Sequence, residues 1–205
     1  MVPANATSIL DVGCSNGALG ASLREMLPGR RVTGIEVDAD FAEQARQRID
    51  EVICADLNTF DWASRMSSRS FDCIIFADVL EHLVDPPRQL RNAQSVLSPG
   101  GCMVISLPNV RHVSALYSIF LRGTFPRRDR GIFDGTHLRW FTIGDARRLV
   151  HDAGMRVEAM DFTLRVGDKG GGFLNKAAIR VLGPVQHRFP VREFLSYQFC
   201  IRAVR

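Results

Sequence analysis

The most constraining feature of this chain is a glycine-containing turn near its start, within the run Ile9–Gly20. A short apolar segment reaches Asp11, and the chain then turns through Gly13, Ser15 and Gly17 into a helix-forming segment. In α/β folds, a turn from a strand into a helix builds a ligand site of nucleotide size. The spacing is D-x-G-x-S-x-G, which disfavours the dinucleotide pattern G-x-G-x-x-G. The alternative is an ordinary turn with no ligand.

An acidic residue follows at the distance expected of a ribose-binding carboxylate. The segment Arg31–Glu36 is apolar enough to form a second strand, and Glu36 lies about 20 residues beyond the glycines. Two carboxylate oxygens match the two hydroxyls of a ribose in a charge-assisted, bidentate pair. We expect Asp38 in the turn before the next helix, with Asp40 as the residue that caps this helix.

Three further segments follow in order along the chain. They are Val52–Leu57, with an aspartate after an apolar run, Ser70–Leu83, which contains DVLEH, and Leu97–Asn109, which contains LSPGG and ends in PN. Together with Asp11 and Glu36, these segments resemble the class I S-adenosylmethionine-dependent methyltransferases over about residues 8 to 109. The resemblance implies S-adenosylmethionine as the cofactor and S-adenosylhomocysteine as its product.

The resemblance also assigns residues to the cofactor, and one of them, Ser15, stands where the family usually has glycine. By this resemblance, Glu36 grips the ribose and Asp56 receives the adenine amino group. The full set is Asp11, Gly13, Cys14, Ser15, Gly17, Glu36, Val37, Asp56, Leu57 and Asp78. Two alternatives stay open, because Asp56 is also suited to forming a turn and Asp78 to capping a helix that begins near Glu81.

The order of apolar segments predicts an α/β fold in one domain, residues 1–205. Strands are expected near residues 8–12, 31–36, 51–55, 71–77, 101–107, 155–164 and 194–204, with helices between them. This alternation is typical of a doubly wound, Rossmann-like, mostly parallel sheet with helices on both faces. The resemblance implies seven strands in the order 3-2-1-4-5-7-6, with the seventh antiparallel. A chain of 205 residues, 46% hydrophobic, can bury one sizeable core.

Local signals predict where several elements begin and end. We expect Thr142 to cap a helix and Gly154 to end it. We expect Gly100–Gly101 to form a sharp turn between a helix and a strand, and Gly167–Gly172 to form a flexible turn. An apolar stripe that ends near Met26 is expected to face the core.

The cysteines and the hydropathy pattern indicate in which cellular compartment the protein is expected. The five cysteines include no C-x-x-C pair and no histidine at metal-ligand spacing, which predicts free thiols in a reducing compartment and no metal site. No apolar run approaches the ~20 residues that span a bilayer, and the N-terminus lacks a basic-then-apolar leader. We therefore expect a soluble, cytoplasmic protein.

About thirty residues connect Asn109 to Phe141, where a short loop would suffice. Such long connections are usually functional or disordered, and this one starts at the carboxyl end of the fifth predicted strand, where α/β sheets bind ligands. Its motifs are similar to a bacterial subgroup related to the ubiquinone-type O-methyltransferases, which often accompany glycosyltransferases. We call residues 109–141 the insertion.

The insertion is rich in arginine between Arg122 and Arg139, and the whole chain carries a net charge of +4. Guanidinium groups suit carboxylate or phosphate, which favours a small-molecule or saccharide acceptor with an anionic group. A solvated basic surface is the alternative. A nucleic-acid substrate is disfavoured, because no run of aromatic residues interleaves with the basic ones.

Methyl transfer to a hydroxyl benefits from a general base, and three histidines are candidates: His82, His112 and His137. His82 is favoured, since it follows the fourth predicted strand beside the expected position of the methyl group. The alternative for His82 is a bond to a backbone carbonyl at a helix start. For His112 and His137 the alternative is a packing role in the insertion.

Two functions from different classes follow. The first is an S-adenosylmethionine-dependent methyltransferase, acting on oxygen or otherwise on nitrogen or carbon. The second is a non-catalytic, methyltransferase-like partner protein similar to the MetW-type proteins of methionine biosynthesis. Only seven residues precede Ser8, whereas the family usually has helices there that cover the cofactor. We expect the insertion, a second copy or another protein to supply this cover, or the site to be more open.

Overall fold

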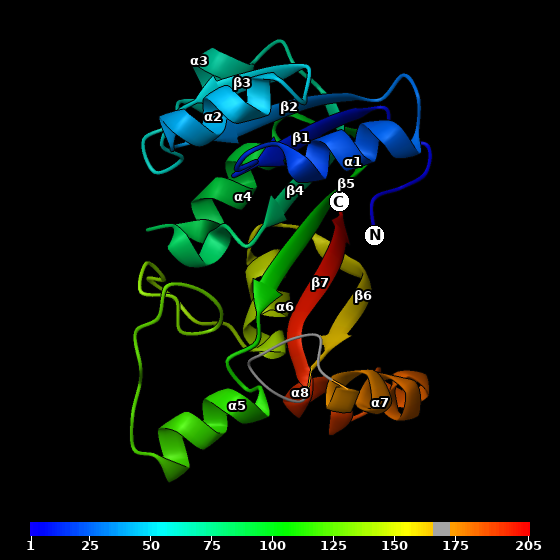
Figure 1. Ribbon diagram of the computed structural model, residues 1–205. Helices are drawn as coiled ribbons and strands as arrows, with labels where there is room; N and C mark the ends of the chain where they lie inside the picture. The colour runs from blue at the N-terminus through cyan, green and yellow to red at the C-terminus, as the bar shows by residue number, and fades with distance from the viewer. Residues whose placement is uncertain (166–172) are drawn as a thin grey trace.

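The chain forms one seven-stranded sheet with the strand order β3-β2-β1-β4-β5-β7-β6. The computed structural model describes residues 1–165 and 173–205, so the predicted turn at Gly167–Gly172 lies outside the described residues (Figure 1). The strands are β1 Ser8–Val12, β2 Arg31–Glu36, β3 Glu51–Cys54, β4 Phe71–Ala77, β5 Leu97–Pro108, β6 Arg156–Leu164 and β7 Ser196–Val204. β7 runs antiparallel to both of its neighbours, and the other pairings are parallel. The predicted strand order and the antiparallel seventh strand are confirmed.

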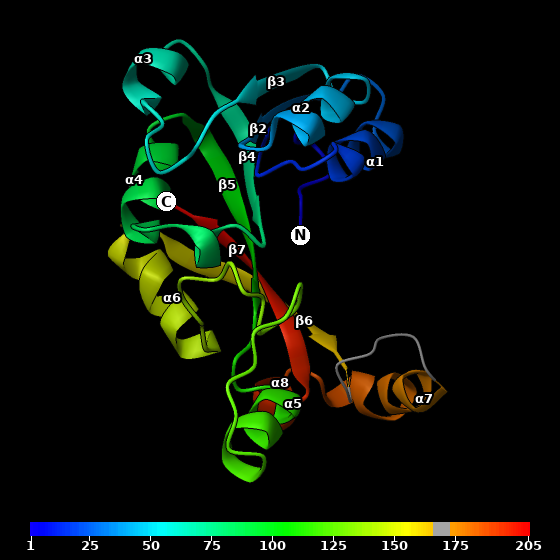
Figure 2. The ribbon, with the colours of Figure 1, turned by 60° about the vertical axis from the view of Figure 1, so that its left-hand side comes forward.

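Helices cover both faces of the sheet (Figure 2). The α-helices are α1 Ala18–Met26, α2 Ala39–Arg46, α3 Trp62–Met66, α4 Pro86–Gln94, α5 Val113–Leu116, α6 Ile143–Asp152, α7 Phe173–Leu182 and α8 Val191–Phe194. On one face, Leu23 of α1 and Ala45 of α2 pack with Ile9 and Val32. On the other face, α3, α4 and α6 pack on the larger apolar cluster, to which Leu90 contributes.

The ends of α6 match the sequence analysis. Thr142 caps its start, because its hydroxyl accepts a hydrogen bond from the Asp145 backbone and the Asp145 carboxylate accepts one from the Thr142 backbone. Gly154 follows the end of α6 with φ 78°, the left-handed conformation that glycine adopts without strain.

Three local predictions are wrong. Asp38, not Asp40, caps α2, since the Asp38 carboxylate accepts hydrogen bonds from the Asp40 and Phe41 backbones. Gly100 and Gly101 lie inside β5 rather than before it, although Gly100 has the expected positive φ of 76°. Met26 is 74% exposed at the last turn of α1, where the helix extends past the edge of the apolar layer.

The insertion begins where β5 ends and contains α5, a π-helical turn at Tyr117–Leu121 and a long loop (Figure 1). Backbone hydrogen bonds join its two ends to each other and hold it against the helical turn at Leu80–His82, which follows β4. The Val110 N–H donates to the Phe141 carbonyl at 3.1 Å, and the N–H groups of Leu138 and Arg139 donate to the Glu81 carbonyl at 2.9 and 3.2 Å. The loop therefore lies at the carboxyl end of β4 and β5. Among the described residues, no helix combines the length and apolarity needed to cross a membrane.

Replacing Thr142, the residue that caps α6, should lower the stability of the fold. Because the Thr142 hydroxyl satisfies an N–H at the helix start, Thr142→Ala should lower the free energy of unfolding by about 1 kcal/mol. Thr142→Ser keeps the hydroxyl and should lie close to the parent chain. Urea unfolding followed by circular dichroism measures both, and equal losses for the two variants would contradict a capping role.

Candidate functional site

The turn between β1 and α1 is held in an unusual backbone conformation. Gly13, Ser15 and Gly17 all have positive φ, at 71°, 48° and 78°. Glycine adopts such values freely, but an L-residue such as Ser15 does so at a cost. Strain of this kind persists only where surrounding contacts fix it, and it is concentrated at functional sites.

Neighbouring residues approach this turn so closely that side chains do not fit at its glycines. A Cβ atom on Gly13 would lie 2.4 Å from the Cγ2 atom of Val79, which follows β4. A Cβ atom on Gly17 would lie 3.0 Å from the Cα atom of Ala45 in α2. The turn therefore fits closely between the segment after β4 and helix α2, with its backbone N–H groups near the carboxyl edge of the sheet.

Glu36, at the end of β2, holds the turn in place. Its Oε2 atom accepts a hydrogen bond from the Ser15 N–H at 2.7 Å. Its Oε1 atom accepts from the N–H groups of Val37 and Asp38 at 2.9 and 3.0 Å. The residue is 8% exposed. The position of Glu36 in the sequence predicts a contact with ribose, but it does not predict this structural role.

Asp11 has a buried carboxylate that receives no hydrogen bond from the described residues. It is 1% exposed, and neither of its side-chain oxygens has a hydrogen-bond partner among the described residues. Burial, and secondly the negative charge of Glu36, raises the pKa of Asp11 from 3.8 to about 7. A buried acceptor with no partner is costly, so this site is suited to a ligand that brings a donor or a positive charge.

Cys14 lies beside Asp11 and is 4% exposed. Burial is the main cause that raises the pKa of its thiol to about 12, with the charges of Asp11 and Glu36 adding to it. The thiol therefore stays protonated, and its Sγ atom fills the space that the absent side chain of Gly34 leaves. Cys14 contributes to the site by shape and not by charge.

Val37 and Asp56 lie beyond the carboxyl ends of the neighbouring strands β2 and β3. Val37 is 65% exposed, whereas Leu57 is buried in the main core cluster. The Asp56 carboxylate accepts hydrogen bonds from the backbone and the side chain of Asn58, at 2.9 and 3.0 Å. Asp56 therefore forms a turn, the alternative left open above, while its proposed contact with adenine stays a prediction.

Asp78 joins three strands at the same edge. It has φ 54°, and its two carboxylate oxygens each accept a hydrogen bond from Gln198 of β7 at 2.7 Å. The Ser106 hydroxyl of β5 donates to Asp78 at 3.2 Å. The helical turn at Leu80–His82 has no side-chain cap, so Asp78 does not cap it.

A cavity of about 980 Å³ opens beside Asp78. It is lined by Asp78, Glu81 and His82 after β4, by Arg128, Arg130, Asp134 and His137 of the insertion, and by Arg165, Tyr197 and Gln198. Val79 contacts the turn after β1, and Asp78 lines the cavity. The turn and the cavity, which are the two halves of the candidate site, therefore meet at adjacent residues. A separate cavity of about 790 Å³, near the amino end of β2, contains none of the predicted site residues.

The structure brings two of the three candidate histidines together. The rings of His82 and His137 have centroids 4.7 Å apart in an edge-to-face arrangement, and both line the cavity. His112 is fully buried elsewhere, with Nε2 donating to the Arg165 carbonyl at 2.6 Å and Nδ1 contacting the Ser114 hydroxyl at 2.8 Å. This geometry favours the packing alternative for His112.

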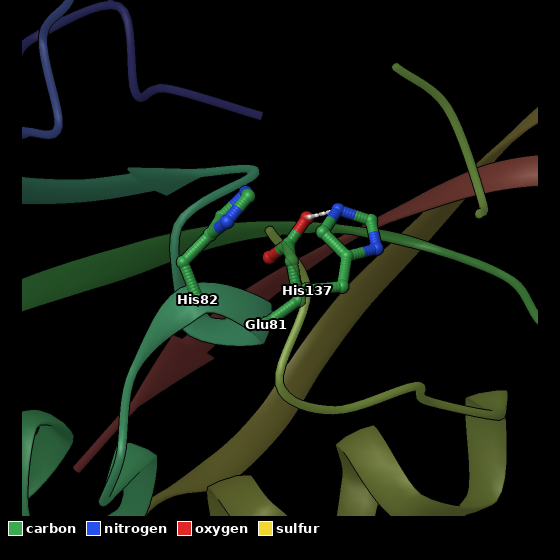
Figure 3. Close-up of side chains that lie close together, drawn as sticks. All are labelled: Glu81, His82 and His137. Atoms are coloured by element: carbon green, nitrogen blue, oxygen red, sulfur yellow. Dashed lines mark ion pairs between the residues drawn. The ribbon is translucent and has the colours of Figure 1, made fainter. Parts of the chain in front are cut away.

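Glu81 is the site residue that the sequence analysis missed. Its carboxylate is 1% exposed, and neither oxygen has a hydrogen-bond partner among the described residues. Its Oε1 atom lies 3.8 Å from the Nε2 atom of His137 (Figure 3). Burial is the largest cause that raises the pKa of Glu81, to about 8. A glutamate within an apolar run, next to a histidine, was the available signal.

Comparison with known proteins identifies relatives of this chain among methyltransferases. Residues 3–160 match a family model described as a methyltransferase domain. The chain is 36% identical over 108 residues to an uncharacterized 37.1 kDa protein in transposon TN4556 of Streptomyces fradiae, covering 50% of this chain and 30% of that protein. It is 28% identical over 117 residues to a ubiquinone biosynthesis O-methyltransferase of Coxiella burnetii, covering 54% of this chain and 47% of the relative. These alignments span less than half of either relative.

A solved structure extends the likeness over the whole fold. An S-adenosylmethionine-dependent methyltransferase from Archaeoglobus fulgidus superimposes with a TM-score of 0.67 at 18% identity, covering 98% of this chain and 87% of that one. At this level of identity the likeness concerns the fold. It includes the sheet whose carboxyl edge carries the turn, Glu36 and the cavity.

Replacing Asp11 should change how stability depends on pH. Because the pKa of Asp11 is raised from 3.8 to about 7, the folded chain holds this proton more tightly than the unfolded chain does. Stability is therefore lost as pH rises between these two values. Asp11→Asn removes this titration, so between pH 4 and pH 8 the parent chain should lose on the order of 4 kcal/mol more of its free energy of unfolding than the variant does.

Denaturant unfolding at pH 4 and pH 8 measures this difference. The exposed Asp152 at the end of α6 provides the control variant, Asp152→Asn, which should leave the pH dependence unchanged. Identical pH dependence in the parent chain and Asp11→Asn would contradict a buried, donor-less carboxylate.

Proposed function

This chain belongs to the methyltransferase domain family, the class I S-adenosylmethionine-dependent methyltransferases, and on that premise we propose that it transfers a methyl group to a hydroxyl of a small-molecule or saccharide acceptor. The observation that carries the proposal is the unpaired, buried Asp11 beside a strained glycine turn. A cavity of about 980 Å³ is lined by Asp78, the residue before Val79, which contacts this turn.

The residues at the carboxyl edge suit S-adenosylmethionine. The Asp11 carboxylate would pair with the ammonium of its methionine part, which brings the donor and the positive charge that Asp11 lacks. Glu36 would receive the ribose hydroxyls, and Gly13 keeps the backbone open to close approach. Val37 and Asp56 would bind the adenine, by apolar contact and by accepting from its amino group.

When bound, S-adenosylmethionine supplies a sulfonium methyl group: the acceptor oxygen forms a bond to the methyl carbon while the carbon–sulfur bond breaks, leaving its electron pair on sulfur and giving S-adenosylhomocysteine. The walls of the cavity hold the acceptor in line, and alignment of this kind is worth about 7–11 kcal/mol of the barrier. The hydroxyl proton must leave as the new bond forms. His82 and His137 bring ring nitrogens to the cavity, where they would accept this proton.

Three arginines on the cavity wall suit an acceptor with an anionic group, beside four carboxylates that line the same cavity. Arg128, Arg130 and Arg165 lie on the cavity wall, together with His82 and His137. Guanidinium groups bind carboxylate or phosphate, so the anionic group would be held on the arginine side while the hydroxyl meets the histidines. The Coxiella burnetii relative is named for O-methyl transfer, which supports oxygen over nitrogen or carbon as the acceptor atom.

Cofactor binding is the first test. Calorimetric titration with S-adenosylmethionine and S-adenosylhomocysteine should show saturable binding, and Glu36→Gln should weaken it at least about tenfold, since it removes a charged acceptor of ribose hydrogen bonds. The control is Glu43→Gln on α2, where the glutamate is exposed and pairs with Arg46. Absence of binding, or equal affinities in all three chains, would overturn the proposal.

Turnover is the second test. Incubation of the chain with methyl-labelled S-adenosylmethionine and bacterial extract, followed by fractionation, should place the label in a small, anionic, alkali-stable product. His82→Ala and His137→Ala should each lower this labelling by at least about a hundredfold. His112→Ala removes a buried packing contact, so it should lower the thermal stability of the chain more than it lowers the labelling. Tight cofactor binding with no labelled product would instead favour a non-catalytic partner protein.

A further inference from the structure

Glu81, His82 and His137 lie together at the base of the acceptor cavity. One potential ligand atom from each residue lies within 4.8 Å of the other two (Figure 3). Ligands bound to one cation at bond lengths of about 2.0–2.2 Å lie roughly 3–3.5 Å apart, so modest side-chain rotations bring these atoms into coordination range. The backbone N–H of Leu138 donates to the Glu81 carbonyl, which fixes the insertion, and with it His137, beside Glu81.

The Glu81 carboxylate is the strongest sign that a ligand belongs here. It is 1% exposed, and no N–H or O–H of the described residues donates to either of its oxygens. A buried carboxylate costs several kcal/mol unless a cation or donors compensate it. The Nε2 atom of His137 lies 3.8 Å from the Oε1 atom of Glu81, which is beyond hydrogen-bond distance.

Further hydrogen bonds orient both histidines as metal ligands require. Nδ1 of His137 donates to the Ile132 carbonyl at 3.3 Å, which leaves the Nε2 lone pair directed toward Glu81. Nδ1 of His82 contacts the Thr136 hydroxyl at 3.1 Å, and that hydroxyl donates to Asp134 at 2.6 Å. Protein metal sites hold their histidines in this way, with one ring nitrogen bonded to a carbonyl or carboxylate system and the other free to coordinate.

The charges around the cluster are also favourable to a cation. Asp78 and Asp134 line the same cavity as the cluster, so two further carboxylates add negative charge beside it. The arginines of the insertion and Arg165 line the same cavity. A cation at the cluster and arginines on the wall would together receive an acceptor that carries an oxygen ligand and an anionic group.

We propose that Glu81, His82 and His137 bind a divalent transition-metal cation, with open coordination positions that face the cavity and receive the acceptor hydroxyl. Two imidazoles and one carboxylate suit zinc, iron(II), cobalt or manganese rather than calcium or magnesium, which take oxygen ligands. Residue spacing along the chain predicts no metal site, because His137 is brought to Glu81 only by the fold.

The metal site adds a catalytic role for the cation to the proposed methyl transfer, and this role rests on the proposed function. Coordination lowers the pKa of a bound hydroxyl, so the oxygen loses its proton to water before it bonds to the methyl carbon. His82 and His137 would then act as metal ligands and not as proton acceptors. The acceptor class narrows to molecules whose methylated hydroxyl can reach a metal ion, such as those with a second oxygen beside it.

Metal binding by the purified full chain tests the site directly. The chain is treated with a chelator, exchanged into metal-free buffer and titrated with Co²⁺, whose visible absorption reports nitrogen and oxygen ligands. We expect saturation near one equivalent and displacement by Zn²⁺. Glu81→Gln, His82→Ala and His137→Ala should each weaken Co²⁺ binding at least about tenfold. The control is His151→Ala, at a side chain that is 87% exposed, which should bind Co²⁺ as the parent chain does.

The affinity for S-adenosylhomocysteine, measured on the same variants, should be unchanged, and this separates loss of the metal site from loss of the fold. Should Glu81→Gln not fold, His82→Ala serves alone. No saturable Co²⁺ binding, or equal Co²⁺ affinity in the parent and all variants, would overturn the metal site even if the chain binds S-adenosylmethionine. Metal binding without binding of S-adenosylmethionine would overturn the proposed function and leave the metal site standing.

The catalytic role of the cation has its own readout. Chelation should abolish labelling of the extract-derived product, and Zn²⁺, Mn²⁺ or Co²⁺ should restore it. Full labelling by chain that mass spectrometry shows to be metal-free would overturn the role of the cation in methyl transfer.

Discussion

The carboxylate of Glu36 holds together two backbone segments at the carboxyl edge of the sheet, the turn after β1 and the end of β2. It accepts from the Ser15 N–H on the turn after β1 and from the Val37 and Asp38 N–H groups at the end of β2. These bonds offset the cost of a serine at φ 48° and keep the turn open. The same residue adds negative charge beside the buried Asp11 and so raises its pKa. One side chain thereby sets both the shape and the charge of this edge.

The site has two halves with different construction. The half assigned to the cofactor is built from strand ends and a tight turn, all within the first three strands. The cavity is built from the segment after β4, the insertion and residues of β7. Val79 and Asp78 connect them, since Val79 packs on Gly13 and Asp78 accepts hydrogen bonds from Gln198. The two halves are therefore joined through adjacent residues of the segment after β4.

Local chemistry made much of the fold predictable. The glycine turn, the capping box at Thr142 and the left-handed Gly154 each depend on a few adjacent residues, and the alternation of apolar segments predicted the strand order through resemblance to a known family. Predictions failed where neighbours compete. Asp38 and Asp40 are both suited to cap α2, and only the backbone geometry decides between them. The pairing of Glu81 with His137, and the burial of His112 against Arg165, depend on long-range contacts that no local pattern contains.

The attachment of the insertion to the sheet has an evolutionary consequence. Its ends are held by main-chain bonds, from Val110 to Phe141 and from Leu138 and Arg139 to Glu81. Main-chain bonds do not depend on the identity of the side chains, apart from the exclusion of proline. Substitutions between these anchors can therefore remodel the wall of the cavity while His137 and the strand ends keep their places. A lineage with this architecture can reshape the cavity by substitutions in one loop, while the main chain that positions the loop stays in place.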